Sequence, residues 1–290
     1  MWAVSPPTVS VEEVARRSAA RIRDKELAAR VREAIPELLR NHNELRRVLT
    51  ASEGHQIAPS DFAVAGLTSK EMVWLYDRQV SDARGAAREC YDDVLACARD
   101  HLCSYCQYGE ATTLDHFFPK KWMSGLAVEP WNLVPACQQC NRKLLDFHAE
   151  TAAEAMFHPY HEGISDRWLY AELLEHDPPA LRFEARPPTG MDPEARARVE
   201  QQFRFTLALN LMYSAVSGRD IAEARAGLSY LVQPGIPGGE QLTPDVATVR
   251  ESLQETARAA FLVDPNSRRG AAYEAMAASE WFCSDGYRLP

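Results

Sequence analysis

Long apolar runs, internal repeats and low-complexity segments are all absent from this sequence of 290 residues. No stretch approaches the about 18 apolar residues that a membrane-spanning helix needs, so no membrane span is expected. Residues 1–7 also lack the basic start and apolar run of a secretory signal, which predicts a cytoplasmic protein in a reducing environment. A hydrophobic content of 46% and a charged content of 25% place the chain among ordinary globular proteins.

An excess of positive charge is absent too. Lys and Arg number 32 against 41 Asp and Glu, and the formal net charge is −9. Affinity for DNA comes mainly from neutralised phosphates, so this balance argues against a free-standing protein that binds DNA tightly. Residues 99–148 contain five basic and five acidic side chains, which confines the acidic excess to the flanks. We therefore expect a partner protein or a second subunit to supply much of the nucleic-acid affinity.

Four of the seven cysteines form two C-x-x-C pairs, Cys103 with Cys106 and Cys137 with Cys140. Each pair places two sulfurs about 4 Å apart on a tight turn, and two such turns complete a tetrahedral site for structural Zn²⁺. A reducing compartment favours this interpretation over two disulfides or four buried thiols. The 30 residues between the pairs, 107–136, exceed the roughly 15–20 of a zinc ribbon, so a further function is expected between them.

An acid and an imidazole lie between the two cysteine pairs. Asp115 and His116 belong to a short predicted strand, where neighbouring side chains point to opposite faces and cannot have the same role. Asn141 directly follows the last cysteine and begins a segment that looks helical. A zinc ion shared by strand and helix would bring Asn141 close to Asp115. Carboxylate and amide oxygens suit a hard cation such as Mg²⁺ or Mn²⁺.

These motifs resemble those of the HNH endonuclease family, specifically its zinc-stapled ββα-metal branch. The shared pattern is C-x-x-C, a D-H pair at the end of the first strand, N-L-x-P-x-C, and C-N followed by basic residues, over about residues 100–148. The resemblance implies a general base, two ligands of a catalytic divalent ion, and an amide that fixes the loop and orients the base. In that order, these residues are His116, Asp115 with Asn141, and Asn132.

The resemblance also implies a substrate and a reaction. His116 would take a proton from a water in line with a phosphodiester of nucleic acid, with DNA as the expected substrate. A Mg²⁺ or Mn²⁺ ion would stabilise the charge on the phosphate and the leaving 3′-oxygen, giving a 5′-phosphate and a 3′-hydroxyl. Arg142 and Lys143 are expected to hold the phosphate. Leu144 stands where the family commonly has lysine, which leaves the role of Lys143 open.

Helices are predicted outside the motif. Capping boxes at Ser10 and Thr68 begin segments with helical spacing that run to about residue 35 and to residue 101, the second with a kink at Gly85. The fold class is therefore mainly α with a small α+β core, a ββα-metal module stapled by a zinc ion on four cysteines. Three regions are expected: a helical region over 1–98, the nuclease core over 99–150, and a mainly helical region over 151–290 with a short strand near 181–185.

Two wider interpretations remain open. The helical lead, the HNH core and the following His-Pro-Tyr segment with Trp168 are similar to HNH nucleases of bacterial anti-phage systems of the Septu type, which act beside an SMC- or ABC-like ATPase. That similarity implies an antiviral role and an ATPase partner, although a solitary restriction-type enzyme fits the acidic flanks as well. The rival interpretation is a non-catalytic zinc-ribbon module that binds nucleic acid. It explains the cysteines but leaves the D-H pair and both asparagines without a role.

Overall fold

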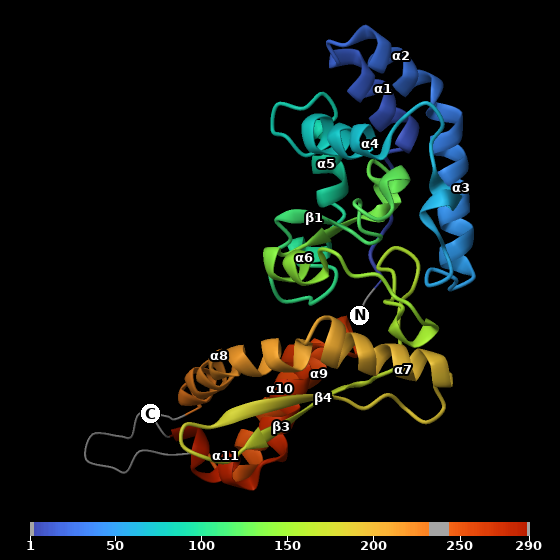
Figure 1. Ribbon diagram of the computed structural model, residues 1–290. Coiled ribbons are helices and arrows are strands. Elements are labelled where there is room, and N and C mark those ends of the chain that lie inside the picture. The colour runs from blue at the N-terminus through green and yellow to red at the C-terminus, as the bar shows by residue number, and fades with distance from the viewer. Residues whose placement is uncertain (1–2, 232–243, 289–290) are drawn as a thin grey trace. The chain divides into compact units, whose positions relative to one another are not determined.

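The computed structural model describes residues 3–231 and 244–288, which form mostly helices (Figure 1). Contacts divide the chain into two compact units, with the division between Ile164 and Ser165. The described strands form two small antiparallel sheets of two strands each, one in each unit. This architecture agrees with the predicted fold class, which is mainly α with a small α+β core. Within the described ranges, no helix combines the length and apolarity that crossing a bilayer requires.

The first unit begins with three helices, α1 (Val11–Arg21), α2 (Lys25–Glu33) and α3 (Ile35–Thr50). Ser10 caps α1, because its side chain accepts a hydrogen bond from the Glu13 amide. The prediction of one helix to about residue 35 is wrong, since Asp24 caps a new helix by accepting from two backbone amides. The apolar faces of α1, α2 and the first half of α3 share one core.

The helix predicted over residues 69–101 is also divided. It consists of α4 (Ser69–Leu75), a π-helical turn (Tyr76–Val80) and α5 (Arg88–Leu95). The chain turns back sharply near Gly85, where an added Cβ would lie only 2.3 Å from the Gln79 carbonyl oxygen. The predicted kink at Gly85 is therefore a full break, and only glycine fits so close an approach. The predicted capping box at Thr68 is present.

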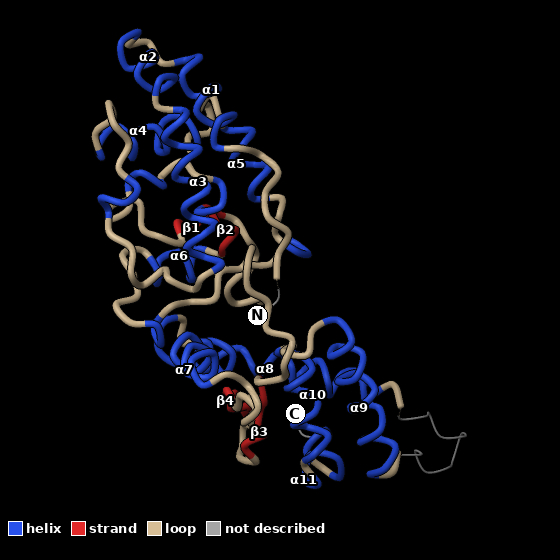
Figure 2. The backbone as a smooth tube through the Cα atoms, turned by 90° about the vertical axis from the view of Figure 1, so that its right-hand side faces the viewer, coloured by secondary structure: helices blue, strands red, loops and turns tan. Residues whose placement is uncertain are grey.

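The small sheet of the first unit pairs β1 (Thr113–His116) with β2 (Leu133–Ala136), with His116 opposite Leu133. The helix α6 (Gln138–Leu144) follows β2 and packs on β1. Figure 2 shows this ββα arrangement, with the two strands in red and α6 beside them. The Cys137 sulfur caps α6 by accepting a hydrogen bond from the Cys140 amide at 3.4 Å. The second C-x-x-C pair therefore also begins the helix that carries Asn141.

The second unit pairs β3 (Leu169–Leu174) with β4 (Ala180–Ala185), which includes the short strand predicted near 181–185. The helix α10 (Arg268–Ala278) packs against β3, and α8 (Leu209–Ser229) packs against β4. The helices of this unit are α7 (Pro193–Gln201), α8 (Leu209–Ser229), α9 (Val246–Val263), α10 (Arg268–Ala278) and α11 (Glu280–Ser284). A bidentate pair between Arg268 and the buried Asp220 joins α10 to α8.

Candidate functional site

The cysteine cluster, formed by the two C-x-x-C pairs, lies at the base of α6. The sulfurs of Cys103, Cys106, Cys137 and Cys140 all lie within 4.8 Å of one another, and all four side chains are buried. The Cys106 and Cys137 sulfurs are 3.9 Å apart. Tetrahedral Zn–S bonds of about 2.3 Å require sulfurs about 3.8 Å apart, so the cluster fits a metal ion held by four thiolates.

Gly109 allows the two C-x-x-C pairs, called the first and second knuckle below, to approach each other. Its amide donates to the Cys106 sulfur at 3.4 Å, a contact that stabilises a thiolate. An added Cβ at Gly109 would lie 2.9 Å from the Cys137 Cβ and 3.1 Å from its sulfur, so a larger residue would push the second knuckle away. The sequence analysis did not select Gly109, although its position three residues after Cys106 was a visible signal.

A cavity of about 310 Å³ lies beside β1 and is called the β1 cavity below. Its lining includes Asp115 and His116 from β1, Asn141 from α6, and Lys120 and Lys121 from the loop after β1. The structure therefore brings together three of the four residues proposed for catalysis. Asn132, Arg142 and Lys143 do not line this cavity.

Asp115 is a buried carboxylate, only 3% exposed. The Tyr105 hydroxyl donates to its Oδ2 at 2.8 Å. Burial raises the pKa of Asp115 to about 7, although the bonds from Tyr105 and from the His116 backbone lower it. Among the residues that the structure describes, no basic side chain forms an ion pair with Asp115. A buried carboxylate that lacks a cationic partner is a suitable ligand for a divalent cation.

His116 is held as a neutral imidazole. Its Nε2 lies 2.9 Å from the Ala127 carbonyl oxygen, which can only accept, so Nε2 carries the proton and Nδ1 the lone pair. Burial lowers the pKa of His116 to about 4. The Tyr76 ring packs edge-on against the imidazole, with centroids 4.3 Å apart. The arrangement gives a base that is unprotonated at neutral pH and fixed in one orientation.

Asn132 is fully buried and spans the loop between the two strands. Its Oδ1 accepts from the Phe118 amide at 2.8 Å, and its Nδ2 donates to the carbonyls of Phe118 and Leu126 at 3.0 and 3.2 Å. Leu126 precedes Ala127, whose carbonyl orients His116. These bonds are the ones that the proposed role of Asn132, fixing the loop and orienting the base, would require.

Asn141 lies at the first turn of α6 with its amide facing β1. The Nδ2 donates to Thr113 Oγ1 at 2.9 Å and to the Leu114 carbonyl at 3.2 Å. Both bonds use the amino side of the amide. Asn141 lines the β1 cavity, and in the described parts of the chain its Oδ1 accepts no hydrogen bond, so this oxygen remains available as a ligand.

The basic side chains of the cavity are Lys120 and Lys121. The Lys120 ammonium pairs with Asp77 and lies 4.5 Å above the centre of the Tyr76 ring. The Lys121 ammonium lies 3.5 Å from Asp146, and both of these groups are exposed. Arg142 and Lys143, predicted to hold the phosphate, are exposed on α6 outside the cavity lining.

Three tyrosines around β1 were not identified as site residues from the sequence. Tyr105 bonds to Asp115, Tyr76 packs on His116, and the Tyr91 hydroxyl accepts from the Leu114 amide at 3.1 Å. Tyr76 and Tyr91 have the helical spacing of core residues, and that spacing predicts only burial. Tyr105 had one signal, its position between the two cysteines of the first knuckle.

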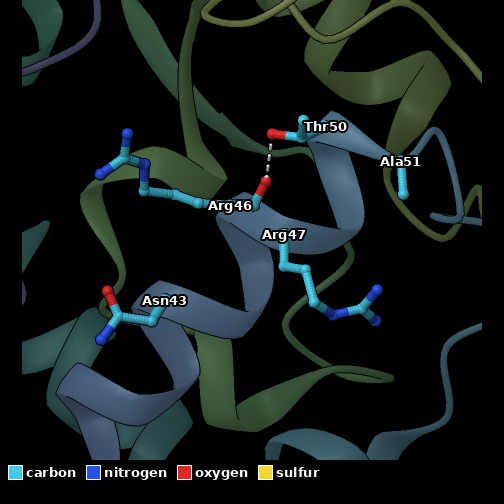
Figure 3. A pocket seen from close by; sticks show the side chains of 5 residues that line it. All are labelled: Asn43, Arg46, Arg47, Thr50 and Ala51. Carbon is cyan, nitrogen blue, oxygen red and sulfur yellow. Dashed lines mark hydrogen bonds between the residues drawn. The ribbon is translucent and has the colours of Figure 1, made fainter.

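A second hollow lies on the exposed face of α3. Figure 3 shows its lining, formed by Asn43, Arg46, Arg47, Thr50 and Ala51. The Thr50 hydroxyl donates to the Arg46 carbonyl at 2.8 Å, and the Arg47 guanidinium pairs with Glu44 and Glu53. Of the residues described, none that lines this hollow carries a carboxylate or an imidazole, so it offers neither a base nor a charged hard-metal ligand.

Comparison with known proteins agrees with the motif. Residues 103–146 match the family described as HNH endonuclease, which confirms the resemblance for this segment. Protein ea31 of Escherichia phage lambda is 28% identical over 183 residues, a match that covers 61% of this chain and 61% of that protein. No solved structure matches the chain. The HNH segment suggests nuclease activity and a nucleic-acid substrate, and it contains the whole cysteine cluster.

Proposed function

We propose that this protein is a metal-dependent HNH endonuclease that hydrolyses phosphodiester bonds of DNA. The observation that carries the proposal is the β1 cavity, where a buried carboxylate, a neutral imidazole and an amide oxygen converge inside the HNH segment. A zinc-ribbon module that only binds nucleic acid would have no need of this combination. The cysteine cluster would hold a structural Zn²⁺, with all four positions filled and none open to water.

Asp115 and Asn141 would hold the catalytic ion, Mg²⁺ or Mn²⁺, through their oxygens. Bound there, such an ion supplies stabilisation of the charge that develops on the phosphate and on the leaving 3′-oxygen. His116 accepts a proton from the attacking water at Nδ1, while its Nε2–H donates to the Ala127 carbonyl and stabilises the imidazolium. The water oxygen bonds to phosphorus as the bond to the 3′-oxygen breaks. The leaving 3′-oxygen takes up a proton from solvent and the His116 imidazolium returns one to solvent, which leaves a 5′-phosphate and a 3′-hydroxyl.

The cellular location of the protein and its partner are part of the same proposal. We place the nuclease in the cytoplasm, where a reducing environment keeps the four cysteines available for zinc. The HNH segment is neutral while the flanks are acidic, which supports a nuclease that receives its DNA from a partner protein. The similarity in layout to Septu-type nucleases favours an ATPase partner and a role in defence against phage. Under this proposal the helical flanks provide the docking surface.

The deciding experiment is plasmid nicking by the wild type and by His116→Ala, with zinc content measured in both. Removal of a general base costs about 10²–10⁴-fold, so cleavage should fall by that factor while zinc stays bound. His161→Ala, which removes an exposed histidine, serves as the matched control. Cleavage should require Mg²⁺ or Mn²⁺ and stop in EDTA. If the wild type binds DNA but never cleaves it under these conditions, the nuclease is refuted and the protein is better described as a zinc-ribbon module that binds nucleic acid.

A further inference from the structure

Tyr105 joins the cysteine cluster to the β1 cavity. It lies between Cys103 and Cys106 in the sequence, is completely buried, and donates its hydroxyl to Asp115 at 2.8 Å. The backbone next to it is tied to β2, because the Ser104 amide donates to the Pro135 carbonyl at 3.0 Å. The tyrosine ring is therefore anchored at its base by the first knuckle, while its hydroxyl reaches a side chain of the cavity.

The bond to Tyr105 restricts the Asp115 carboxylate. A carboxylate offers about four lone-pair positions, and here the Tyr105 hydroxyl occupies one of them. Rotation of the carboxylate would break the bond to Tyr105 and leave its fully buried hydroxyl without a hydrogen-bond partner. The remaining lone pairs are thereby held in one direction. Hydrogen bonds of this kind orient metal ligands, and their loss typically costs about 10–100-fold in metal affinity or activity.

We infer that Tyr105 is a positioning residue for the catalytic divalent ion, through which the zinc knuckle orients Asp115. The inference rests on the proposed function, because it takes Asp115 as a ligand of that ion. It adds a dependence of one metal site on the other. Zinc would support catalysis not only by holding the fold but by fixing the tyrosine that aims the carboxylate.

Tyr105→Phe tests the inference, because it removes the hydroxyl and keeps the ring. Tyr160→Phe is the matched control, since the Tyr160 hydroxyl is also buried but donates to the Leu133 carbonyl at 2.7 Å and not to Asp115. Zinc-loaded proteins would be titrated with Mn²⁺ without DNA, with free Mn²⁺ followed by electron paramagnetic resonance. We expect Mn²⁺ binding about 10–100-fold weaker in Tyr105→Phe, unchanged in Tyr160→Phe, and one zinc per chain in both.

Cleavage assays complete the test. In Tyr105→Phe, the Mg²⁺ concentration for half-maximal cleavage should rise by the same factor, while the rate at saturating Mg²⁺ stays close to that of the wild type. Equal Mn²⁺ affinity in the two variants overturns the inference. So does loss of zinc from Tyr105→Phe alone, because the hydroxyl would then support the knuckle instead.

The outcomes for the wild type separate this inference from the proposed function. A wild type that binds Mn²⁺ without cleaving DNA refutes the nuclease, while the Mn²⁺ titrations still decide the role of Tyr105. A wild type that neither binds Mn²⁺ nor responds to Mg²⁺ refutes the assignment of Asp115 as a ligand and the role of Tyr105 with it.

Discussion

The cysteine cluster and the β1 cavity share one short stretch of chain, yet their donor groups differ in number, burial and chemistry. The cluster has four soft sulfur donors, all buried and all within 4.8 Å of one another. The β1 cavity offers two hard oxygen donors, from Asp115 and Asn141, beside about 310 Å³ of space. A closed tetrahedral set suits a structural ion, whereas an open set leaves positions for water and substrate. The comparison predicts that the two sites respond differently to mutation, to pH and to chelators.

The largest effect should come from the cysteine cluster. Structural zinc in small sites contributes about 10–16 kcal/mol of apparent binding free energy, most of which is coupled to folding. Cys137→Ser should therefore release zinc and unfold the ββα core, with complete loss of cleavage. Cys97→Ser, which changes a cysteine outside the cluster, should keep both zinc and activity. Zinc analysis with thermal unfolding measures the outcome, and a folded, zinc-free, fully active Cys137→Ser protein would contradict it.

The residues that come together in these two places could be predicted from the sequence because their spacing is local. The structure brings the sulfurs of both C-x-x-C pairs within 4.8 Å of one another and places Asp115 and His116 on the lining of one cavity. The helix ends were predicted less well. The break at Gly85 depends on the Gln79 carbonyl, and that contact exists only once the chain has turned back on itself.

The polar groups around Asp115 and His116 could not be predicted for a related reason. The bond from Tyr105 to Asp115 links the first knuckle to β1, and the Ala127 carbonyl reaches His116 from the middle of a loop. The position of Tyr105 between two cysteines marks the residue but not its partner, and the Ala127 carbonyl has no sequence signal, because both contacts depend on how the loops close over the strands. Arg142 and Lys143 were expected to hold the phosphate because they follow Asn141 in the sequence, whereas the basic side chains that line the β1 cavity are Lys120 and Lys121.

Metal binding at the β1 cavity should depend on pH through the Asp115 carboxylate. Burial raises the pKa of Asp115 to about 7, so below that pH the carboxyl group holds a proton that an incoming cation must displace. Mn²⁺ affinity of the zinc-loaded protein should fall about tenfold per pH unit below 7 and level off above it. Titrations from pH 5.5 to 8 would measure this slope.

Two controls sharpen the pH prediction. Asp115→Ala should lose both Mn²⁺ binding and the slope, while zinc stays bound. Because burial lowers the pKa of His116 to about 4, the base remains neutral across this range. Cleavage at saturating metal should therefore not decline with the ordinary histidine pKa of about 6.5. Equal Mn²⁺ affinity at pH 6 and pH 8 would show that Asp115 is already ionised or is not a ligand.

The smallest effect should separate the basic residues inside the β1 cavity from those outside it. Lys120 lines the cavity, whereas Arg142 is exposed on α6, one residue and about 100° around the helix from Asn141. A phosphate bound beside Asp115 therefore lies within the field of Lys120, although the Asp77 carboxylate offsets part of that charge. We expect Lys120→Ala to lower kcat/KM about tenfold and Arg142→Ala less than threefold, close to the cost of one exposed phosphate contact.

Measuring kcat/KM of both variants at two salt concentrations tests the distinction. The Arg142→Ala effect should shrink as salt rises, whereas the Lys120→Ala effect should persist, because a partly buried ammonium is screened less. A larger loss in Arg142→Ala than in Lys120→Ala would place the phosphate on the outer face of α6 and favour the assignment made from the sequence.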